Sequence, residues 1–154
     1  MSAMLVRLLL AVGISAGLVG AWRLASAFVL WRSGRSASRL GEFARGTPGV
    51  VFFTTPDCVT CKAAQRPALA ALRARMGEAV QVIEVDAQDN VALARDWAVL
   101  SVPTTFILDR DGTPRQVNHG FASADKLAAQ IASLTQASAA ARGQQPETER
   151  EAHG

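Results

Sequence analysis

The sequence predicts an α/β domain with the element order β-α-β-α-β-β-α, placed behind a long apolar helix. Two observations predict the domain. The apolar run from Val50 to Phe53 leads directly into a helical pattern, and a second buried run, residues 104–108, ends in the turn from Asp109 to Gly112. The N-terminal helix is predicted from residues 9–31, among which Arg23 is the only charged residue.

Each element of the domain has a local signal in the sequence. The first helix is rich in alanine and leucine, which are strong helix formers, and its charges fall on the outer face. Asp89 can cap the second helix and Ser123 the last one, while Gly112 accepts the positive φ of a hairpin turn. The expected elements are strands 50–53, 80–85, 104–108 and 115–119 and helices 62–75, 90–98 and 123–135.

Four segments are expected along the chain. Residues 1–32 form a membrane anchor, and residues 33–47 a linker rich in Ser, Gly and Arg, with at most a short helix around 38–44. Residues 48–135 form the α/β domain, which is small but can bury one sheet between helices. Residues 136–154 have no apolar period and are predicted to be a disordered tail.

The only two cysteines, Cys58 and Cys61, stand where the first strand passes into the first helix. Two thiols at this spacing can open and close as a disulfide. The first sulfur lies at the helix N-terminus, where unpaired N–H groups and the helix dipole favour a thiolate, the nucleophile of disulfide exchange. Half of a zinc site is the alternative, but the chain has no second CxxC or CxxH to complete four ligands.

Residues 48–135 resemble the thioredoxin family through three motifs, which are Cys58–Lys62 after the first strand, Val102–Thr104 opening the third, and Gly112 in the hairpin with Gly120 after it. The resemblance implies a thioredoxin-like fold, with a central mixed sheet flanked by helices. It also implies that Pro103 is cis and lies against the cysteines, so that Val102 presents its N–H and C=O to a substrate strand. An ordinary strand-start proline is the alternative. The linker stands where thioredoxins carry an extra strand and helix, so a trimmed fold is expected.

The chain departs from the thioredoxin pattern around the cysteines. Asp57 replaces the usual tryptophan, and its negative charge should raise the pKa of the Cys58 thiol. Phe52 and Val82 fall where the family has a buried acid and its lysine partner; replacing both is self-consistent, because replacing one would leave a buried charge unpaired. Pro67, the match to the proline that bends the active-site helix, stands one residue later than usual.

Two residues are candidates for the missing proton-transfer role. Glu84 lies on the strand beside Phe52, on the same face as Val82. His119 precedes Gly120, where a histidine can stabilise the Cys58 thiolate or carry a proton near neutral pH. The alternatives are a partly solvated strand glutamate and a surface histidine.

Residues 9–31 are long enough for a membrane-spanning helix, since about 23 residues extend roughly 34 Å. Arg23 can extend its side chain toward the headgroups, and Trp22 and Trp31 suit the membrane interface. A cleaved signal peptide with an Ala25–Ala27 cleavage site is the alternative. We favour the uncleaved anchor, because cleavage would leave residues 28–31 as an exposed apolar N-terminus.

The net charge of +3 is concentrated around the anchor. Six arginines and one acid precede Thr47, so the rest of the chain carries 10 basic and 12 acidic residues, which gives no basis for nucleic-acid binding. The positive-inside rule predicts a cytoplasmic domain, because four arginines follow the span, namely Arg32, Arg35, Arg39 and Arg45. An extracytoplasmic domain, or one secreted after cleavage, is the alternative. Two cysteines without spare ones fit a reducing compartment.

The sequence therefore predicts a single-pass membrane-tethered thiol–disulfide oxidoreductase that reduces protein disulfides without a cofactor or metal. Cys58 attacks the substrate disulfide, and Cys61 attacks the resulting mixed disulfide and releases reduced substrate. Electrons come from a reductase or a dithiol protein, and the lipid bilayer is contacted through residues 9–31. One alternative is a soft-metal chaperone that binds Cu(I) through Cys58, Cys61 and His119. The other is a redox-inactive binding module, which the intact CxxC disfavours.

Overall fold

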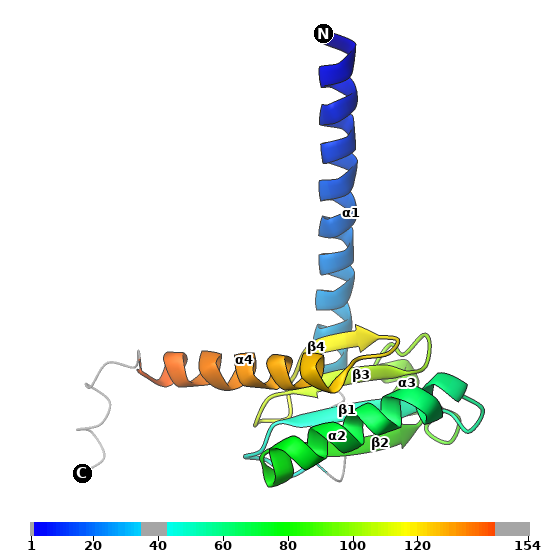
Figure 1. Ribbon diagram of the computed structural model, residues 1–154, viewed down its shortest axis with the longest axis vertical. Helices are drawn as coiled ribbons and strands as arrows, with labels where there is room; N and C mark the ends of the chain where they lie inside the picture. The colour runs from blue at the N-terminus through cyan, green and yellow to red at the C-terminus, as the bar shows by residue number, and fades with distance from the viewer. Residues whose placement is uncertain (1, 35–42, 144–154) are drawn as a thin grey trace.

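A mixed sheet with helices on both faces follows a long projecting helix in the computed structural model, which describes residues 2–34 and 43–143 (Figure 1). The element order confirms the predicted β-α-β-α-β-β-α domain behind an apolar helix. The elements are α1 (Ser2–Gly34), β1 (Gly49–Thr54), the π-helical turn η2 (Cys61–Gln65), α2 (Arg66–Met76), the 3₁₀ turn η3 (Gly77–Ala79), β2 (Gln81–Asp86), α3 (Val91–Asp96), β3 (Thr104–Leu108), β4 (Pro114–His119) and α4 (Ala124–Gly143).

The four strands lie in the order β2-β1-β3-β4. β1 pairs with β2 in parallel and with β3 antiparallel, and β3 pairs antiparallel with β4. Every residue of β1 and β3 is buried, because these two strands are central and both faces of the sheet are covered. The mixed sheet that the resemblance implied is therefore confirmed.

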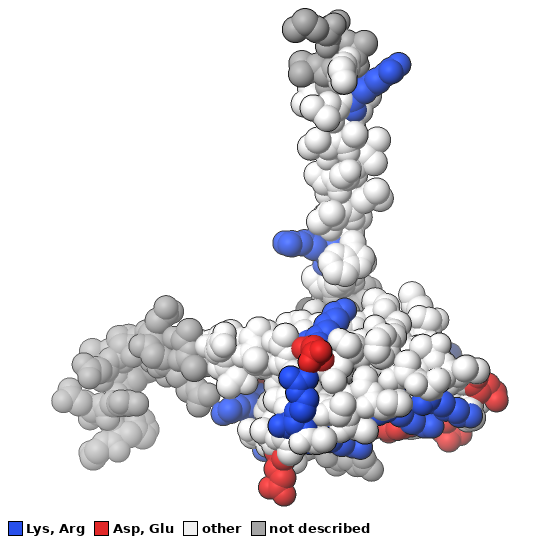
Figure 2. Space-filling model, in the orientation of Figure 1, with Lys and Arg blue, Asp and Glu red and all other residues white. Residues whose placement is uncertain are grey.

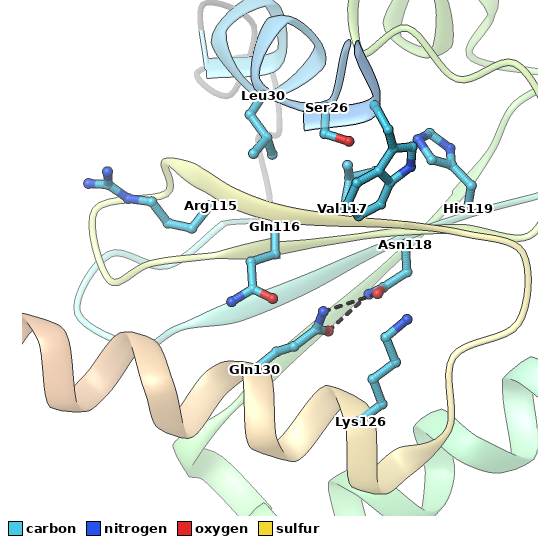
Figure 3. A pocket seen from close by; sticks show the side chains of 10 residues that line it. Ser26, Leu30, Arg115, Gln116, Val117, Asn118, His119, Lys126 and Gln130 are labelled. Carbon is cyan, nitrogen blue, oxygen red and sulfur yellow. Dashed lines mark hydrogen bonds between the residues drawn. The ribbon is translucent and has the colours of Figure 1, made fainter. Parts of the chain in front are cut away.

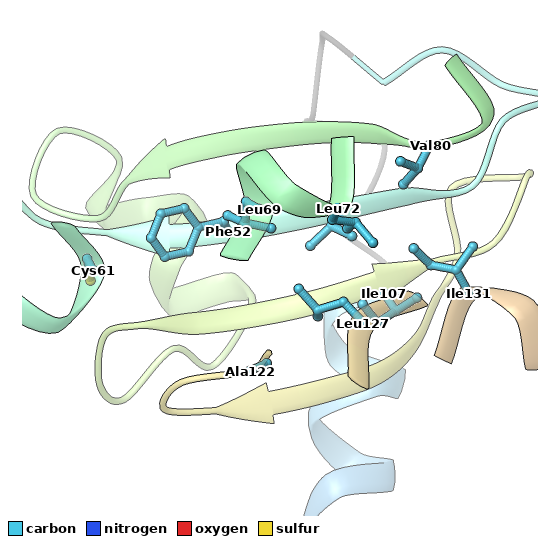
Figure 4. Close-up of a cluster of buried hydrophobic side chains, with 10 residues drawn as sticks. Phe52, Cys61, Leu69, Leu72, Val80, Ile107, Ala122, Leu127 and Ile131 are labelled. Atoms are coloured by element: carbon cyan, nitrogen blue, oxygen red, sulfur yellow. The ribbon is translucent and has the colours of Figure 1, made fainter. Parts of the chain in front are cut away.

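Side chains alternate between two cores on the two faces of the sheet. On the face covered by α2 and α4, Phe52 and Ile107 pack with Leu72 and Leu127, and Cys61 belongs to this first core (Figure 4). On the opposite face, Val51, Phe53 and Phe106 pack around Trp97, whose ring meets the Phe106 ring edge-on at 4.8 Å. The site cysteines are thus attached to the first core.

The second core is completed by residues that precede β1. Val29 and Leu30 of α1 and Phe43 pack against it. The Phe43 ring lies over the β3–β4 hairpin, where a Cβ on Gly112 would come within 3.0 Å of it. Gly112 has φ +84°, so the predicted positive φ is confirmed. The end of α1 and Phe43 therefore cover part of the sheet in this trimmed fold.

Three predicted boundaries were wrong. α4 continues to Gly143, so residues 136–143 are helical and not part of a disordered tail. They continue the helix just beyond Leu134, which is half-buried beside the first core. α1 continues through residues 33 and 34, which were assigned to the linker. The proposed short helix at 38–44 is absent at residues 43 and 44, and its other residues, like residues 144–154, lie outside the described ones.

α1 contains the stretch Arg7–Leu30, which is long and apolar enough to cross a membrane and is the only such stretch in the described part of the chain. The helix has no acidic residue in its first turn, and apolar side chains surround it along most of its length. A helix that is apolar on all sides is unstable in water unless a membrane or a protein core surrounds it.

Candidate active site

The two cysteines form a closed disulfide between the end of β1 and the start of the active-site helix, with 2.05 Å between the sulfur atoms. Cys58 is half-buried, whereas Cys61 is completely buried in the first core. The N–H of Cys61 donates to Cys58 Sγ at 3.1 Å, and the N–H of Lys62 donates to the Cys58 carbonyl at 3.2 Å. Cys58 therefore lies at the helix start, as expected, with a backbone donor directed at its sulfur.

A π turn follows the cysteines and explains the late proline. The N–H of Arg66 donates to the Cys61 carbonyl, five residues earlier, and Pro67 lies in the first turn of α2. A π turn adds one residue to an α-helix, and such turns are frequent at functional sites. The extra residue lets Pro67, which has no N–H, stay at a position where none is required.

Gln65, at the end of the π turn, is a site residue that the sequence analysis missed. Its side chain is completely buried, and its amide pairs with both backbone groups of Ala122, accepting from the N–H at 2.9 Å and donating to the C=O at 3.1 Å. Its spacing of four residues from Cys61 was the available signal, because residues at that spacing share a helix face. Gln65 joins the active-site helix to the loop after β4.

The loop before β3 lies on the same side. The Val102–Pro103 bond is cis, as the resemblance implied. Val102 and Cys58 both pack at the edge of the first core, and the N–H of Gly120 donates to the Pro103 carbonyl at 2.8 Å. Three segments therefore meet at one end of the sheet, namely the cysteine turn, the proline loop and the loop after β4.

Exposed apolar side chains accompany this end of the sheet, and the sequence analysis did not identify them. Val59 lies between the two cysteines, Phe121 follows Gly120, and Leu100 precedes the proline loop; all three are exposed. Each belongs to or adjoins one of the three segments that meet at the cysteines, and exposed apolar side chains near a site indicate a surface that binds another molecule. We call these three residues the apolar rim.

The two acidic residues predicted to tune the site are exposed, whereas the Cys61 sulfur is buried. Asp57 is exposed beside Cys58. Glu84 is opposite Phe52 on the neighbouring strand, and Val82 is opposite Val50. Glu84 is exposed and accepts two hydrogen bonds from Arg66, at 3.1 and 2.5 Å.

The bond from Arg66 to Glu84, together with their charge attraction, raises the pKa of the Arg66 guanidinium. Glu84 is thus held in a surface ion pair. Among the described residues, Asp109 is the only buried acid. It lies at the other end of β3, where it accepts from Arg115 at 2.7 Å. The structure therefore places no buried acid beside Cys61.

His119 lies on the other face of the sheet from Cys61. It pairs with Thr104 at the end of β4, and strand alternation puts it on the side of Val117, which packs against the second core. Figure 3 shows it directed toward α1. In the described residues, no three His, Cys, Asp or Glu side chains come together as metal ligands would. The geometry thus does not favour a Cu(I) site built from the cysteines and His119.

Comparisons with known proteins agree with the fold and the cysteine turn. The thioredoxin family model matches residues 42–133. Thioredoxin of Bacillus subtilis is 31% identical over 86 residues, covering 54% of this chain and 81% of that protein. The structure of Fasciola hepatica thioredoxin is 28% identical, with a TM-score of 0.51 over 58% of this chain and 83% of that one.

A thioredoxin-like protein of Clostridium perfringens is also similar, at 25% identity and a TM-score of 0.56, covering 62% of this chain and 76% of the other. The fold, the cysteine pair at the start of a helix and these matches support thiol–disulfide oxidoreductase chemistry. This chain belongs to the thioredoxin family.

Proposed function

We propose that this chain is a membrane-tethered protein-disulfide reductase. The observation that carries the proposal is the difference between the two sulfur environments. Cys58 is half-buried and accepts a backbone N–H at the helix start, whereas Cys61 is completely buried. A thiolate at Cys58 is therefore accessible to a substrate and stabilised, and Cys61 is reached only from Cys58.

The exchange begins with reduced protein. The Cys58 thiolate attacks one sulfur of a substrate disulfide, forming a Cys58–substrate disulfide and releasing the other substrate sulfur as a thiolate. The Cys61 thiolate then attacks Cys58 Sγ, re-forms the Cys58–Cys61 disulfide and releases the second substrate thiolate. Two electrons pass to the substrate, and a reductase or dithiol protein returns two electrons to the chain. The exchange itself requires no bound cofactor.

The substrate is proposed to be a protein segment that lies across the proline loop. Val102 supplies backbone groups beside Pro103, and the apolar rim of Val59, Leu100 and Phe121 contacts the side chains around the disulfide. Apolar contact suits a reductase with many substrates, because it is non-directional and demands no particular sequence. The expected partners are therefore disulfide-bearing proteins.

α1 is proposed to tether the domain to a lipid bilayer as an uncleaved span. The apolar stretch Arg7–Leu30 supports this proposal, because its side chains are exposed over most of its length. The arginines that follow the span favour a cytoplasmic domain. A reducing compartment also suits a dithiol that acts as a reductant.

Reduction of insulin by the full-length protein in nanodiscs tests the activity. Pre-reduced wild type should release the insulin B chain, and Cys58→Ser should lose more than about 99% of the initial rate, since the attacking thiolate is absent. His119→Ala should keep the wild-type rate. A wild type that leaves insulin intact but binds Cu(I) tightly, with affinity lost in His119→Ala, would contradict the reductase and support the chaperone.

A further inference from the structure

The last two turns of α1 belong to the folded domain. Ser26, Val29 and Leu30 are half-buried, at the spacing of one helix face. Together with Trp22, one turn earlier, Ser26 and Leu30 line a cavity of about 410 Å³ against β4 and α4 (Figure 3). On the other side of the helix Leu24 is 74% exposed.

This packing limits how much of α1 can lie in hydrocarbon. The cavity beside Ser26 is also lined by Arg115, His119 and Lys126, and none of its lining residues is acidic. These charged and polar groups would be costly to place inside a bilayer. The part of α1 beside β4 must therefore lie outside the hydrocarbon core, either among the headgroups or in the water on the side of the domain.

The membrane-crossing part of α1 then ends at about Arg23. Residues 4–22 extend about 28 Å as a helix, close to the roughly 30 Å of a hydrocarbon core. Arg7 is the one charged residue among them, and its long side chain can reach the headgroups at the far end of the helix. Figure 2 shows an uncharged column between the basic residue near the far end of α1 and the one above the domain. Trp22 and Arg23 have the amphipathic and basic side chains that are typical of the headgroup region.

The cysteine turn and the proline loop lie close to the height at which α1 leaves the membrane. β4 is the strand that packs against α1, and its last residue, His119, is paired with Thr104. Gly120 follows His119, and Pro103 precedes Thr104. The N–H of Gly120 donates to the Pro103 carbonyl, so the proline loop lies beside this end of β4. Leu30 lies only about 10 Å further along the helix than Arg23. α1 stands across the strands (Figure 1), so the site faces along the bilayer surface.

On the basis of the proposed function, we propose that the substrates are membrane proteins whose disulfides lie close to the bilayer surface. A flexible tether of n residues would let the dithiol range over about 5–6 Å × √n. Direct packing of α1 on the sheet instead holds Cys58 at one height. Disulfides at that height meet the thiolate at a high effective concentration, whereas distant ones do not.

Two model substrates in the same vesicles test the proposal. Each is a single-span helix followed by the same disulfide loop, attached either directly or through a 30-residue Gly/Ser spacer. Pre-reduced full-length protein should reduce the directly attached loop at least about tenfold faster, because only that loop is confined near Cys58. Insulin in solution serves as the reference substrate for each protein.

Two variants separate the effect of α1 packing on the height of the site from the redox chemistry. Leu30→Asn weakens the packing of α1 on the sheet, and twelve Gly/Ser residues inserted after Arg23 move the intact domain away from the bilayer. Both should bring the two vesicle rates within about twofold of each other, and the insertion should keep the insulin rate. Leu24→Asn, on the exposed side of the same helix, should keep the tenfold preference.

The possible failures are distinguishable. Equal reduction of both loops by the wild type, with insulin still reduced, would overturn the proposed substrate class and leave the reductase standing. A preference that persists in the insertion variant would also overturn it, because the height of the site would then be irrelevant. Loss of insulin reduction by the wild type would overturn the reductase itself.

Discussion

The two sulfur atoms of the disulfide have different surroundings, and this difference is the basis of their proposed roles. Cys58 lies before the first helical turn, half-buried, and accepts the N–H of Cys61. Cys61 packs in the first core with Phe52 and is inaccessible to a substrate. Because Cys61 is completely buried but lies within bonding distance of Cys58, it is suited to an attack on Cys58 Sγ and unsuited to the first attack on a substrate.

The first prediction is that Cys61→Ser accumulates a mixed disulfide through Cys58, whereas Cys58→Ser accumulates almost none. Without Cys61 the mixed disulfide cannot be resolved internally, so it should persist at least about tenfold longer than in the wild type. Mass spectrometry of captured substrate peptides measures both variants. Comparable capture by the two single variants would contradict the assignment of the attacking sulfur.

The second prediction concerns Asp57, which is exposed beside Cys58. Asp57→Asn removes a negative charge next to the thiolate, so the variant should react with iodoacetamide severalfold faster at neutral pH. Asp111→Asn, which makes the same charge change in the hairpin at the other end of β3, is the matched control and should leave the rate unchanged. An unchanged rate in Asp57→Asn would show that solvent screens this charge, and a slower rate would contradict the predicted direction of its effect.

The sequence predicted the site residues that belong to motifs and missed those that depend on tertiary packing. Cys58 and Pro103 are recognisable because their spacing from neighbouring elements is local information. The orientation of His119 depends on which face of β4 meets α1, and this was not decided by the residues around it. Gln65 was missed because its partner, Ala122, lies 57 residues away.

At the scale of elements, the π turn and Gln65 join the helix that carries the cysteines to the loop after β4. The turn shifts the helix by one residue, and this brings Gln65 to a buried position facing the Ala122 backbone. A buried peptide group without a partner is costly, so the two hydrogen bonds hold the loop in place. The same loop carries Gly120 and Phe121, which border the site.

The third prediction is that Gln65→Leu destabilises the domain by about 1–3 kcal/mol, because both buried backbone groups of Ala122 lose their partner. The variant should also reduce insulin more slowly than the wild type, since the loop at the site is no longer held. Urea unfolding followed by tryptophan fluorescence, to which the buried Trp97 contributes, measures the stability. Gln88→Leu, at an exposed position, is the control, and an equal loss in both variants would contradict a specific role for Gln65.

Most element boundaries were predictable to within two or three residues, since periodicity and capping residues act locally. The strand expected at 80–85 is Gln81–Asp86, and the helix expected at 90–98 is Val91–Asp96. Two features were not predictable in this way. The π turn has the same local composition as an α-helix, and α4 extends to Gly143 through residues whose composition resembles a tail.

For the whole molecule, the central ambiguity is the apolar segment at the N-terminus. An apolar stretch with a single charged residue can pack equally well in lipid or against a protein core, so the sequence alone could not divide α1 between the two. The packing of Val29 and Leu30 on the second core shows that one end of α1 serves the domain. The other end remains apolar and exposed, and this part is suited to a bilayer.

The fourth prediction concerns topology. The full-length protein should stay in the membrane fraction after carbonate extraction, because α1 is proposed to be an uncleaved span. Its C-terminal domain should face the cytoplasm, because Arg32, Arg35, Arg39 and Arg45 follow the span. A C-terminal alkaline phosphatase fusion should therefore be inactive, and a fluorescent-protein fusion bright.

Moving positive charge to the other end of the span provides the control. Replacing Arg32, Arg35, Arg39 and Arg45 by Asn and adding lysines before residue 7 should invert the two reporters, since charge bias sets the orientation. An active phosphatase on the wild type would contradict the cytoplasmic orientation, and a mature N-terminus at Phe28 would contradict the anchor. If only the orientation failed, the dithiol would work outside the cytoplasm with electrons passed across the membrane. Its preference for disulfides near the bilayer would persist, because that preference depends on the packing of α1 against β4 and not on the side of the membrane.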